Sequence, residues 1–100
     1  MIKKINVGLI GAGFMGKAHV VAYSNMPKFF WPAPAVPVLK IVCDVEEEIA
    51  KEAKDRFGFE EAVTDWKAVV NNPDIDVVSI CTPNDSHAEI AIAALEAGKH

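Results

Sequence analysis

A glycine-rich turn near the start of the chain constrains its fold more than any other feature. Residues 5–10 read INVGLI, a short β-branched apolar run that favours a buried strand over a helix. GAGFMG follows at once at residues 11–16, and residues 14–26 favour a helix. A strand that passes through glycines directly into a helix predicts a βα unit, whose next strand runs parallel to the first.

Strands and helices alternate along the rest of the chain. In the second helix, for example, Ile49, Ala53 and Phe57 lie on one apolar stripe. Further strands are expected at 38–43, 62–64 and 76–82, and further helices at 46–57, from Asp65 to Val70, and at 86–97. This order predicts an α/β fold, a Rossmann-type doubly wound parallel sheet with helices on both faces.

Capping residues and prolines set the expected ends of these elements. Gly58 is placed to end the second helix. Asp65 can cap the short helix that follows it, and either Asn84 or Asp85 can cap the last one. Four prolines within 26–37 predict a loop, because proline interrupts helices and central strands. The aromatic residues of this loop are expected to pack on a part of the protein beyond this chain or on another subunit, with local packing as the alternative.

The composition excludes several classes of function. With 51% hydrophobic and 24% charged residues, the 100-residue chain can form one packed domain. Its net charge of −4 argues against a nucleic acid as the main partner. Its two cysteines provide neither a disulfide framework nor a close metal-binding pair. We find no signal peptide and no apolar run long enough to span a membrane, and therefore expect a cytoplasmic protein without a metal site.

The glycine turn has the GxGxxG spacing of dinucleotide-binding turns, in the required place between a strand and a helix. Gly11 permits the tight turn, Gly13 lets a pyrophosphate approach the backbone, and Gly16 lets the helix pack closely on the strand. Backbone N–H groups and the helix dipole would then hold the phosphates. The alternative is a glycine turn without a ligand. A mononucleotide P-loop is disfavoured, because Ala18 follows Lys17 where that motif needs Ser or Thr.

Asp44 ends the second strand and can accept hydrogen bonds from the ribose hydroxyls of a dinucleotide. Its distance along the chain from the glycine turn exceeds the usual value of about 20 residues, and the 26–37 loop accounts for the excess. The alternative is an ordinary strand-end or capping Asp. Three glutamates follow at 46–48, and no basic residue occurs before Lys51, so NAD is predicted over NADP, whose 2′-phosphate needs a nearby Arg.

Two later motifs add a family resemblance. TPN at 82–84 is followed by His87, and ALEAGKH occupies 94–100. Together with the glycine turn and His19, these motifs resemble the glucose–fructose oxidoreductase and inositol dehydrogenase family, often called Gfo/Idh/MocA. The resemblance covers essentially the whole chain, and the stretch at 29–40 resembles a sugar-oxidising subgroup.

The resemblance implies NAD as cofactor and places Thr82, Pro83 and Asn84 on its nicotinamide side, with His87 close by. His87 could instead be a surface histidine, and for His19 a packing role is as good an explanation as a contact. The candidate cofactor-binding residues are Gly11, Gly13, Phe14, Met15, Gly16, Asp44, Thr82, Pro83, Asn84 and His87. Cys43 and Cys81 lie inside apolar strands and are expected to be inert buried thiols.

Hydride transfer from a sugar or polyol hydroxyl needs a general acid or base. In the resembling family this role involves a lysine of an EKP motif soon after AGKH and a histidine of a second domain. Lys99 belongs to AGKH and is not that lysine, so no catalytic residue is assigned within the chain. We therefore expect residues 1–100 to be an incomplete dinucleotide-binding domain, without its substrate domain and inactive alone, from a homo-oligomeric NAD-dependent sugar or polyol dehydrogenase.

The sequence leaves two other functions open. One is a non-catalytic dinucleotide-binding sensor or regulatory module. The other is a methyltransferase, which shares an acidic residue after the second strand but ranks last, because such enzymes usually carry a glycine where this chain has Met15.

Overall fold

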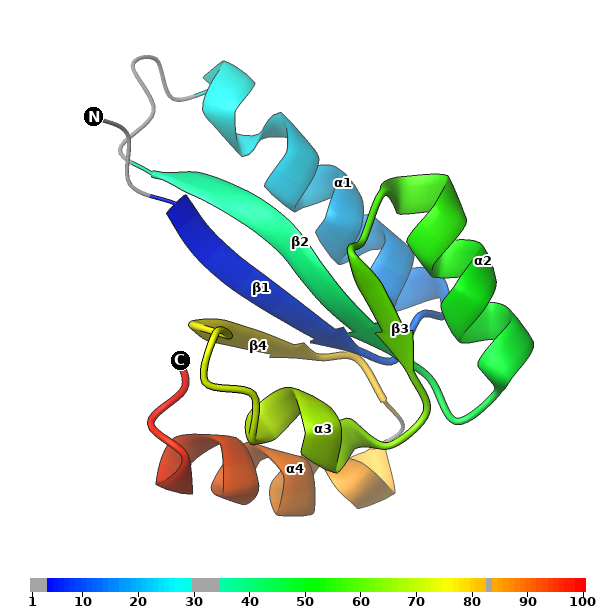
Figure 1. The fold of residues 1–100 in the computed structure, drawn as a ribbon, viewed down its shortest axis with the longest axis vertical. Coiled ribbons are helices and arrows are strands. Elements are labelled where there is room, and N and C mark those ends of the chain that lie inside the picture. The colour runs from blue at the N-terminus through cyan, green and yellow to red at the C-terminus, as the bar shows by residue number, and fades with distance from the viewer. Residues whose placement is uncertain (1–3, 30–34, 83) are drawn as a thin grey trace.

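Four parallel strands form one sheet with helices on both faces (Figure 1), as predicted. The structure is a computed structural model that describes residues 4–29, 35–82 and 84–100. The strands lie in the order β3-β2-β1-β4. Their bounds are Lys4–Ile10 for β1, Val36–Cys43 for β2, Glu61–Val63 for β3 and Val77–Ile80 for β4. The helices are α1 (Phe14–Phe29), α2 (Glu47–Phe57), α3 (Trp66–Val70) and α4 (Asn84–Glu96).

The core is divided between the two faces of the sheet, because successive strand residues point in opposite directions. Leu9 packs in a buried cluster with Val20 of α1, on the face that α1 and α2 cover. The next residue, Ile10, packs with Val69 of α3 and Ile90 of α4 on the other face. A parallel sheet buried on both sides explains why its strands read as continuous apolar runs.

The predicted end of α2 at Gly58 and the predicted cap of α3 at Asp65 are confirmed. Gly58 follows α2 with a positive φ of 83°, and its N–H donates to the carbonyl of Lys54 at 2.9 Å. The carboxylate of Asp65 accepts a hydrogen bond from the N–H of Lys67 at 3.0 Å and caps α3. These contacts satisfy backbone groups that have no partner within the helix.

The bounds predicted for the 26–37 loop are wrong at both ends. Helix α1 continues through Pro27 to Phe29, and β2 begins at Val36 and includes Pro37. Pro27 lies in the last turn of α1, and the helix continues for only two residues beyond it. Pro37 lies where β2 has only β1 as a neighbour, since β3 pairs with β2 from Ile41 onward, and proline is tolerated at such an edge.

The remaining differences are small. Helix α4 begins at Asn84, so Asn84 and Asp85 lie in its first turn and neither precedes it as a cap. Several cap-forming residues in a row do not specify which of them starts the helix. Strand β4 is shorter than the predicted 76–82, because its pairing with β1 covers only Val77–Ile80. The aromatic residues Phe30 and Trp31, with the role predicted for their loop, lie outside the described residues.

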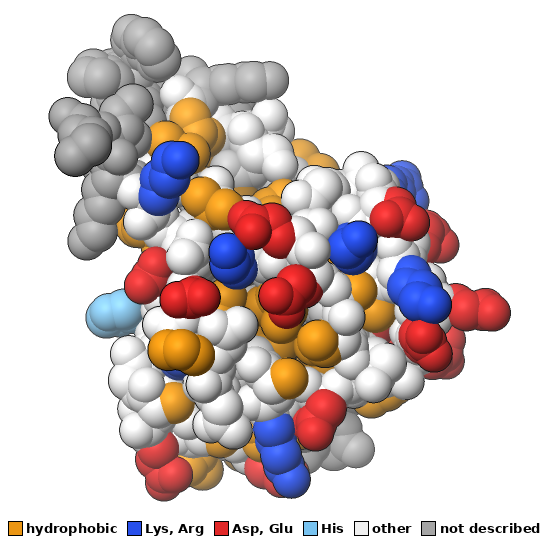
Figure 2. Space-filling view, viewed as in Figure 1, with side chains coloured by type: hydrophobic (Ala, Val, Ile, Leu, Met, Phe, Trp, Pro, Cys, Tyr) orange, Lys and Arg blue, Asp and Glu red, His pale blue; other side chains and the backbone are white. Residues whose placement is uncertain are grey.

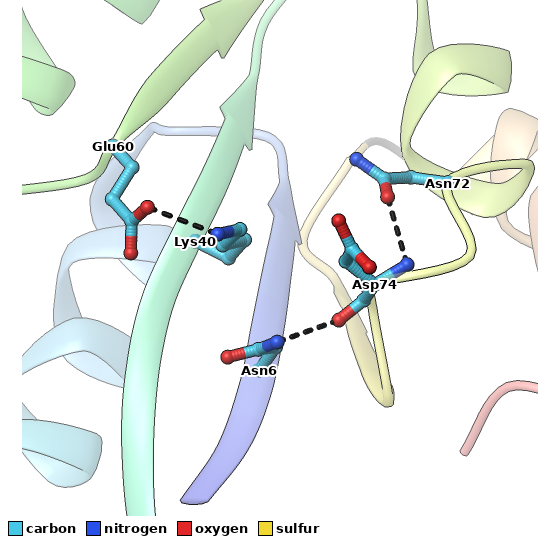
Figure 3. Close-up of polar contacts among 5 residues, drawn as sticks. All are labelled: Asn6, Lys40, Glu60, Asn72 and Asp74. Carbon is cyan, nitrogen blue, oxygen red and sulfur yellow. Dashed lines mark hydrogen bonds and ion pairs between the residues drawn. The ribbon is translucent and has the colours of Figure 1, made fainter.

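Polar contacts fix the turn between α3 and β4 against the start of β1 (Figure 3). The side chain of Asn6 donates to the carbonyl of Asp74 at 2.8 Å, and the N–H of Asp74 donates to the Asn72 side chain at 2.9 Å. Beside them, Lys40 pairs with Glu60 at 3.0 Å, and the hydrogen bond and charge of Glu60 raise the pKa of Lys40. Acidic and basic side chains are interspersed over this face of the molecule (Figure 2).

Gly8 of β1 allows α3 to pack directly against the sheet. A Cβ atom at this position would lie 2.6 Å from Cγ1 of Val69, a residue with no exposed surface. The pairing of β1 with β2 also shifts register between Val7 and Gly8.

We expect Gly8→Ala to lower the free energy of unfolding by about 1–3 kcal/mol, because the added methyl group overpacks the contact with Val69. Urea unfolding followed by circular dichroism measures the loss. Gly13→Ala is the matched control, since a Cβ there meets no atom within 4 Å and Gly13 has no positive φ. Equal stability of Gly8→Ala and the unmodified protein would contradict the close packing described here.

Candidate functional site

The carboxyl ends of β1, β2 and β4 meet around one cavity. The N–H of Gly11 donates to the carbonyl of Cys43 at 2.8 Å, and the N–H of Cys81 donates to the carbonyl of Ile10 at 2.7 Å. These bonds hold the three strand ends together. A cavity of about 520 Å³ opens at this edge, and its walls include Gly11, Gly13, Asp44 and Thr82. Ligands of open parallel sheets bind at this edge.

The three motif glycines differ in what a side chain at each position would meet. Gly11 has a φ of 96°, and a Cβ there would lie 2.6 Å from the carbonyl oxygen of Cys81. A Cβ at Gly16 would overlap the carbonyl oxygen of Gly11. Gly13 is exposed and a Cβ there would meet nothing within 4 Å, so the protein itself does not require glycine at this position. The open space fits a ligand that approaches the backbone at Gly13.

Helix α1 begins directly after Gly13. Its first hydrogen bond runs from the N–H of Lys17 to the carbonyl of Gly13 at 3.0 Å, and its first turn contains no acidic residue. The positive end of the helix dipole therefore lies at the cavity, without a carboxylate of its own first turn to compete with an anion. A pyrophosphate fits this arrangement. The side chains of Phe14 and Met15, two of the predicted cofactor contacts, lie outside the described part of the structure.

Asp44 joins the glycine turn to the start of α2. Its Oδ2 accepts a hydrogen bond from the N–H of Ala12 at 3.1 Å, and its Oδ1 accepts one from the N–H of Glu46 at 3.0 Å. Each carboxylate oxygen can accept a second hydrogen bond. Asp44 thus makes a local turn contact just before α2, although no described side chain caps that helix, and it also lines the cavity where ribose hydroxyls could donate to it.

Charge near Asp44 is predominantly negative. Glu47 and Glu48 lie in the first turn of α2. Lys51, the first basic residue after Asp44, is engaged in an exposed ion pair with Glu47 at 3.0 Å. A second phosphate group beside Asp44 would therefore meet several carboxylates and one cation that is already paired.

The β4 side of the cavity differs in part from the prediction. Thr82 lines the cavity, whereas His87, half-buried in the first turns of α4, is not among its lining residues. Pro83 lies outside the described residues, as does the side chain of Asn84. His19 makes a specific contact, because its Nδ1 lies 3.0 Å from Sγ of Cys81.

The two cysteines are not equivalent. Cys43 is buried as predicted, but Cys81 is only partly buried and lines the cavity, so the prediction of burial is wrong for Cys81. A side chain at the end of a strand is shielded on one side only, and this is where Cys81 lies. Burial raises the pKa of both thiols, which disfavours the reactive thiolate.

Seven described residues that line the cavity are absent from the predicted cofactor contacts: Ile10, Cys43, Val45, Thr64, Trp66, Cys81 and Ile90. Val45 follows Asp44, Thr64 follows β3 directly, and Trp66 is the first residue of α3. Thr64 could have been found, because the predicted third strand ends beside the second and its last residue shares the same edge. Val45 and Trp66 carry no motif that would have distinguished them.

Residues 5–100 match the family described as "Oxidoreductase family, NAD-binding Rossmann fold", GFO_IDH_MocA. The chain belongs to this family. The resemblance seen in the motifs is thereby confirmed, and so is the Rossmann-type fold.

Individual members of the family show how close the similarity is. The chain is 61% identical over 99 residues to levoglucosan dehydrogenase from Pseudarthrobacter phenanthrenivorans. The aligned segment covers 99% of this chain and 25% of that protein. It is 28% identical over 96 residues to myo-inositol 2-dehydrogenase from Thermotoga maritima. That alignment covers 96% of this chain and 26% of the other protein. A solved structure of levoglucosan dehydrogenase in complex with NADH and L-sorbose superposes with a TM-score of 0.95, covering 99% of this chain and 26% of the other. The chain thus spans about a quarter of the length of these relatives.

Within residues 4–29, 35–82 and 84–100, no helix combines the length and apolar character needed to cross a membrane.

We expect the Cys43 thiol to lower the free energy of unfolding in alkali. Burial, followed by the charges of Asp44 and Asp65, raises its pKa from 9.0 to about 11. The folded state therefore holds this proton more tightly than the unfolded state. The resulting stabilisation is complete below pH 9 and is lost as the pH rises from 9 through 11.

We expect the urea midpoint of the unmodified protein to fall more steeply between pH 9 and 11 than that of Cys43→Ala. Other groups titrate in both proteins, so the difference between the two curves isolates the thiol. Parallel curves would show that Cys43 has the same pKa folded and unfolded.

Proposed function

We propose that this chain is the cofactor-binding part of an oxidoreductase that transfers hydride between a sugar or polyol hydroxyl and NAD. The observation that carries this proposal is the cavity in which the open backbone at Gly13, the start of α1 and the carboxylate of Asp44 meet. The names of the relatives support the class of substrate, since they include a levoglucosan dehydrogenase and an inositol dehydrogenase.

The residues of the cavity would divide the dinucleotide between them. Gly11, Gly13 and Gly16, with the first N–H groups of α1, would hold the pyrophosphate, and Asp44 would hold the ribose of the adenosine half. Thr82 would lie beside the nicotinamide half. Roles for Phe14, Met15, Pro83, Asn84 and His87 remain predictions from the family resemblance. When bound, the nicotinamide ring supplies the hydride chemistry, and the protein orients it.

We also propose that the dinucleotide-binding domain extends past residue 100. The N–H of His100 donates to the carbonyl of Asp76 at 3.1 Å, and its carbonyl accepts from the N–H of Val78 at 2.7 Å. This pair of bonds is the pattern by which a parallel strand pairs with β4. Ile92 and Leu95 of α4 are also 57% and 72% exposed, as expected for a helix face that a further element would cover.

The acid or base that handles the hydroxyl proton is proposed to come from outside these residues. Lys99 supports this view, because its Nζ donates to the carbonyl of Asn72 at 2.6 Å. Asn72 lies in the turn that leads into β4, at the end of the sheet opposite to the cavity. We therefore expect no turnover by the 100-residue chain alone. The expectations of a cytoplasmic location and a homo-oligomer remain predictions from the sequence.

The activity can be tested with the full-length parent protein. We expect it to reduce NAD with levoglucosan or a polyol such as myo-inositol, measured by the absorbance of NADH. Gly13→Ala should fold normally but lose most of this activity, because its methyl group occupies the approach of the pyrophosphate. Tight NAD binding without reduction by any sugar or polyol would favour the sensor alternative over the dehydrogenase.

The preference for NAD is a separate prediction. We expect Asp44→Ala to weaken NAD binding by roughly tenfold or more, because hydrogen bonds to a charged group are lost, and to reduce the discrimination against NADP. Calorimetric titration of both cofactors measures the two effects. Glu48→Gln is the control, since it removes a nearby exposed charge and should change NAD affinity less than twofold, or about 0.4 kcal/mol. Tighter binding of NADP than NAD by the unmodified protein would contradict the prediction.

A further inference from the structure

Two hydrogen bonds between side chains join α1 to β4. Nδ1 of His19 lies 3.0 Å from Sγ of Cys81, and the hydroxyl of Tyr23 lies 2.5 Å from Oγ of Ser79. His19 and Tyr23 are one turn apart and share a face of α1. Ser79 and Cys81 are two positions apart along one extended segment and point to the same face of the sheet. The helix that carries the glycine turn is thus attached to β4 by a polar seam.

The two bonds of this seam end in different places. Cys81 lines the cavity, and its carbonyl is the atom that a Cβ at Gly11 would meet. Ser79 lies within β4, paired with Leu9, and is not among the lining residues. The His19 bond therefore reaches the wall of the site, whereas the Tyr23 bond stops one turn short of it.

The first bond joins a thiol to an imidazole, and either group can be the donor. Burial raises the pKa of the Cys81 thiol, so the sulfur keeps its proton near neutral pH. The S–H group can donate to Nδ1 of His19 or accept from it, according to the tautomer of the ring. In either direction the bond fixes the orientation of both side chains.

We propose that His19 is a positioning residue for the dinucleotide. Through Cys81 it fixes the distance between the start of α1, where the pyrophosphate would bind, and the end of β4, where Thr82 lines the cavity. This inference rests on the proposed function, because it concerns the affinity for NAD. His19 touches neither the cavity nor any reacting atom, and it acts only through Cys81.

The test compares variants of the full-length parent protein. His19→Leu removes the ring nitrogen that bonds to Cys81, and we expect it to raise the Kd for NAD about fivefold to tenfold, the effect of one lost hydrogen bond. His19→Asn places an amide where Nδ1 was and should restore the affinity to within about twofold. The kcat at saturating NAD should change little in either variant.

Tyr23→Phe is the matched control, since it removes the other bond of the same seam. It should lower the melting temperature about as much as His19→Leu does, yet leave the Kd for NAD within about twofold of the unmodified value. Equal weakening of NAD binding by both variants would mean that they act only by loosening α1, which would overturn the proposal.

A double-mutant cycle identifies the partner. In a Cys81→Ala background, His19→Leu should have almost no further effect on the Kd for NAD. A full additional effect would overturn the proposed route through Cys81. If the affinity of His19→Leu for NAD is unchanged, the role proposed for His19 is overturned while the proposed function stands. If the unmodified protein binds no NAD, the proposed function itself fails.

Discussion

The close approach of Gly11 to the end of β4 is the constraint on which the site depends. The turn passes between β2 and β4, bonded to the carbonyl of Cys43 on one side and in contact with the carbonyl of Cys81 on the other. A side chain at Gly11 would meet that second carbonyl and would also be strained by the positive φ. Any residue but glycine would therefore push the turn away from β4 and separate the two walls of the cavity.

Close packing at glycine recurs along β1 and its turn for the same physical reason. Gly8 admits Val69 of α3 on one face of the sheet, and Gly16 brings the first turn of α1 against the carbonyl of Gly11 on the other. Apart from the polar seam between α1 and β4, the two faces are covered mainly by apolar side chains, so polar groups for binding are presented mainly at the carboxyl edge of the sheet. The rigid core fixes where that edge lies, and the loops supply its chemistry.

Much of this could be predicted from the sequence, because the signals were local. The apolar runs, the GxGxxG spacing and the cap at Asp65 each specify structure within a few residues, and each was confirmed. The positions of Pro27 and Pro37 were not predictable in this way, since a proline is tolerated or not according to its place in a helix or sheet. The contact between His19 and Cys81 joins residues far apart in sequence, and only the packing of α1 on β4 brings them together.

The contact between Asp44 and Ala12 couples the two halves of the site. The carboxylate that would receive the ribose is held by an N–H of the turn that would receive the pyrophosphate. A second N–H, from Glu46, fixes its other oxygen, so the carboxylate is oriented before any ligand arrives. Preorganisation of this kind reduces the entropy lost on binding. A displacement of the glycine turn would also move Asp44, so the ribose and pyrophosphate contacts are set by one structural unit and are gained or lost together.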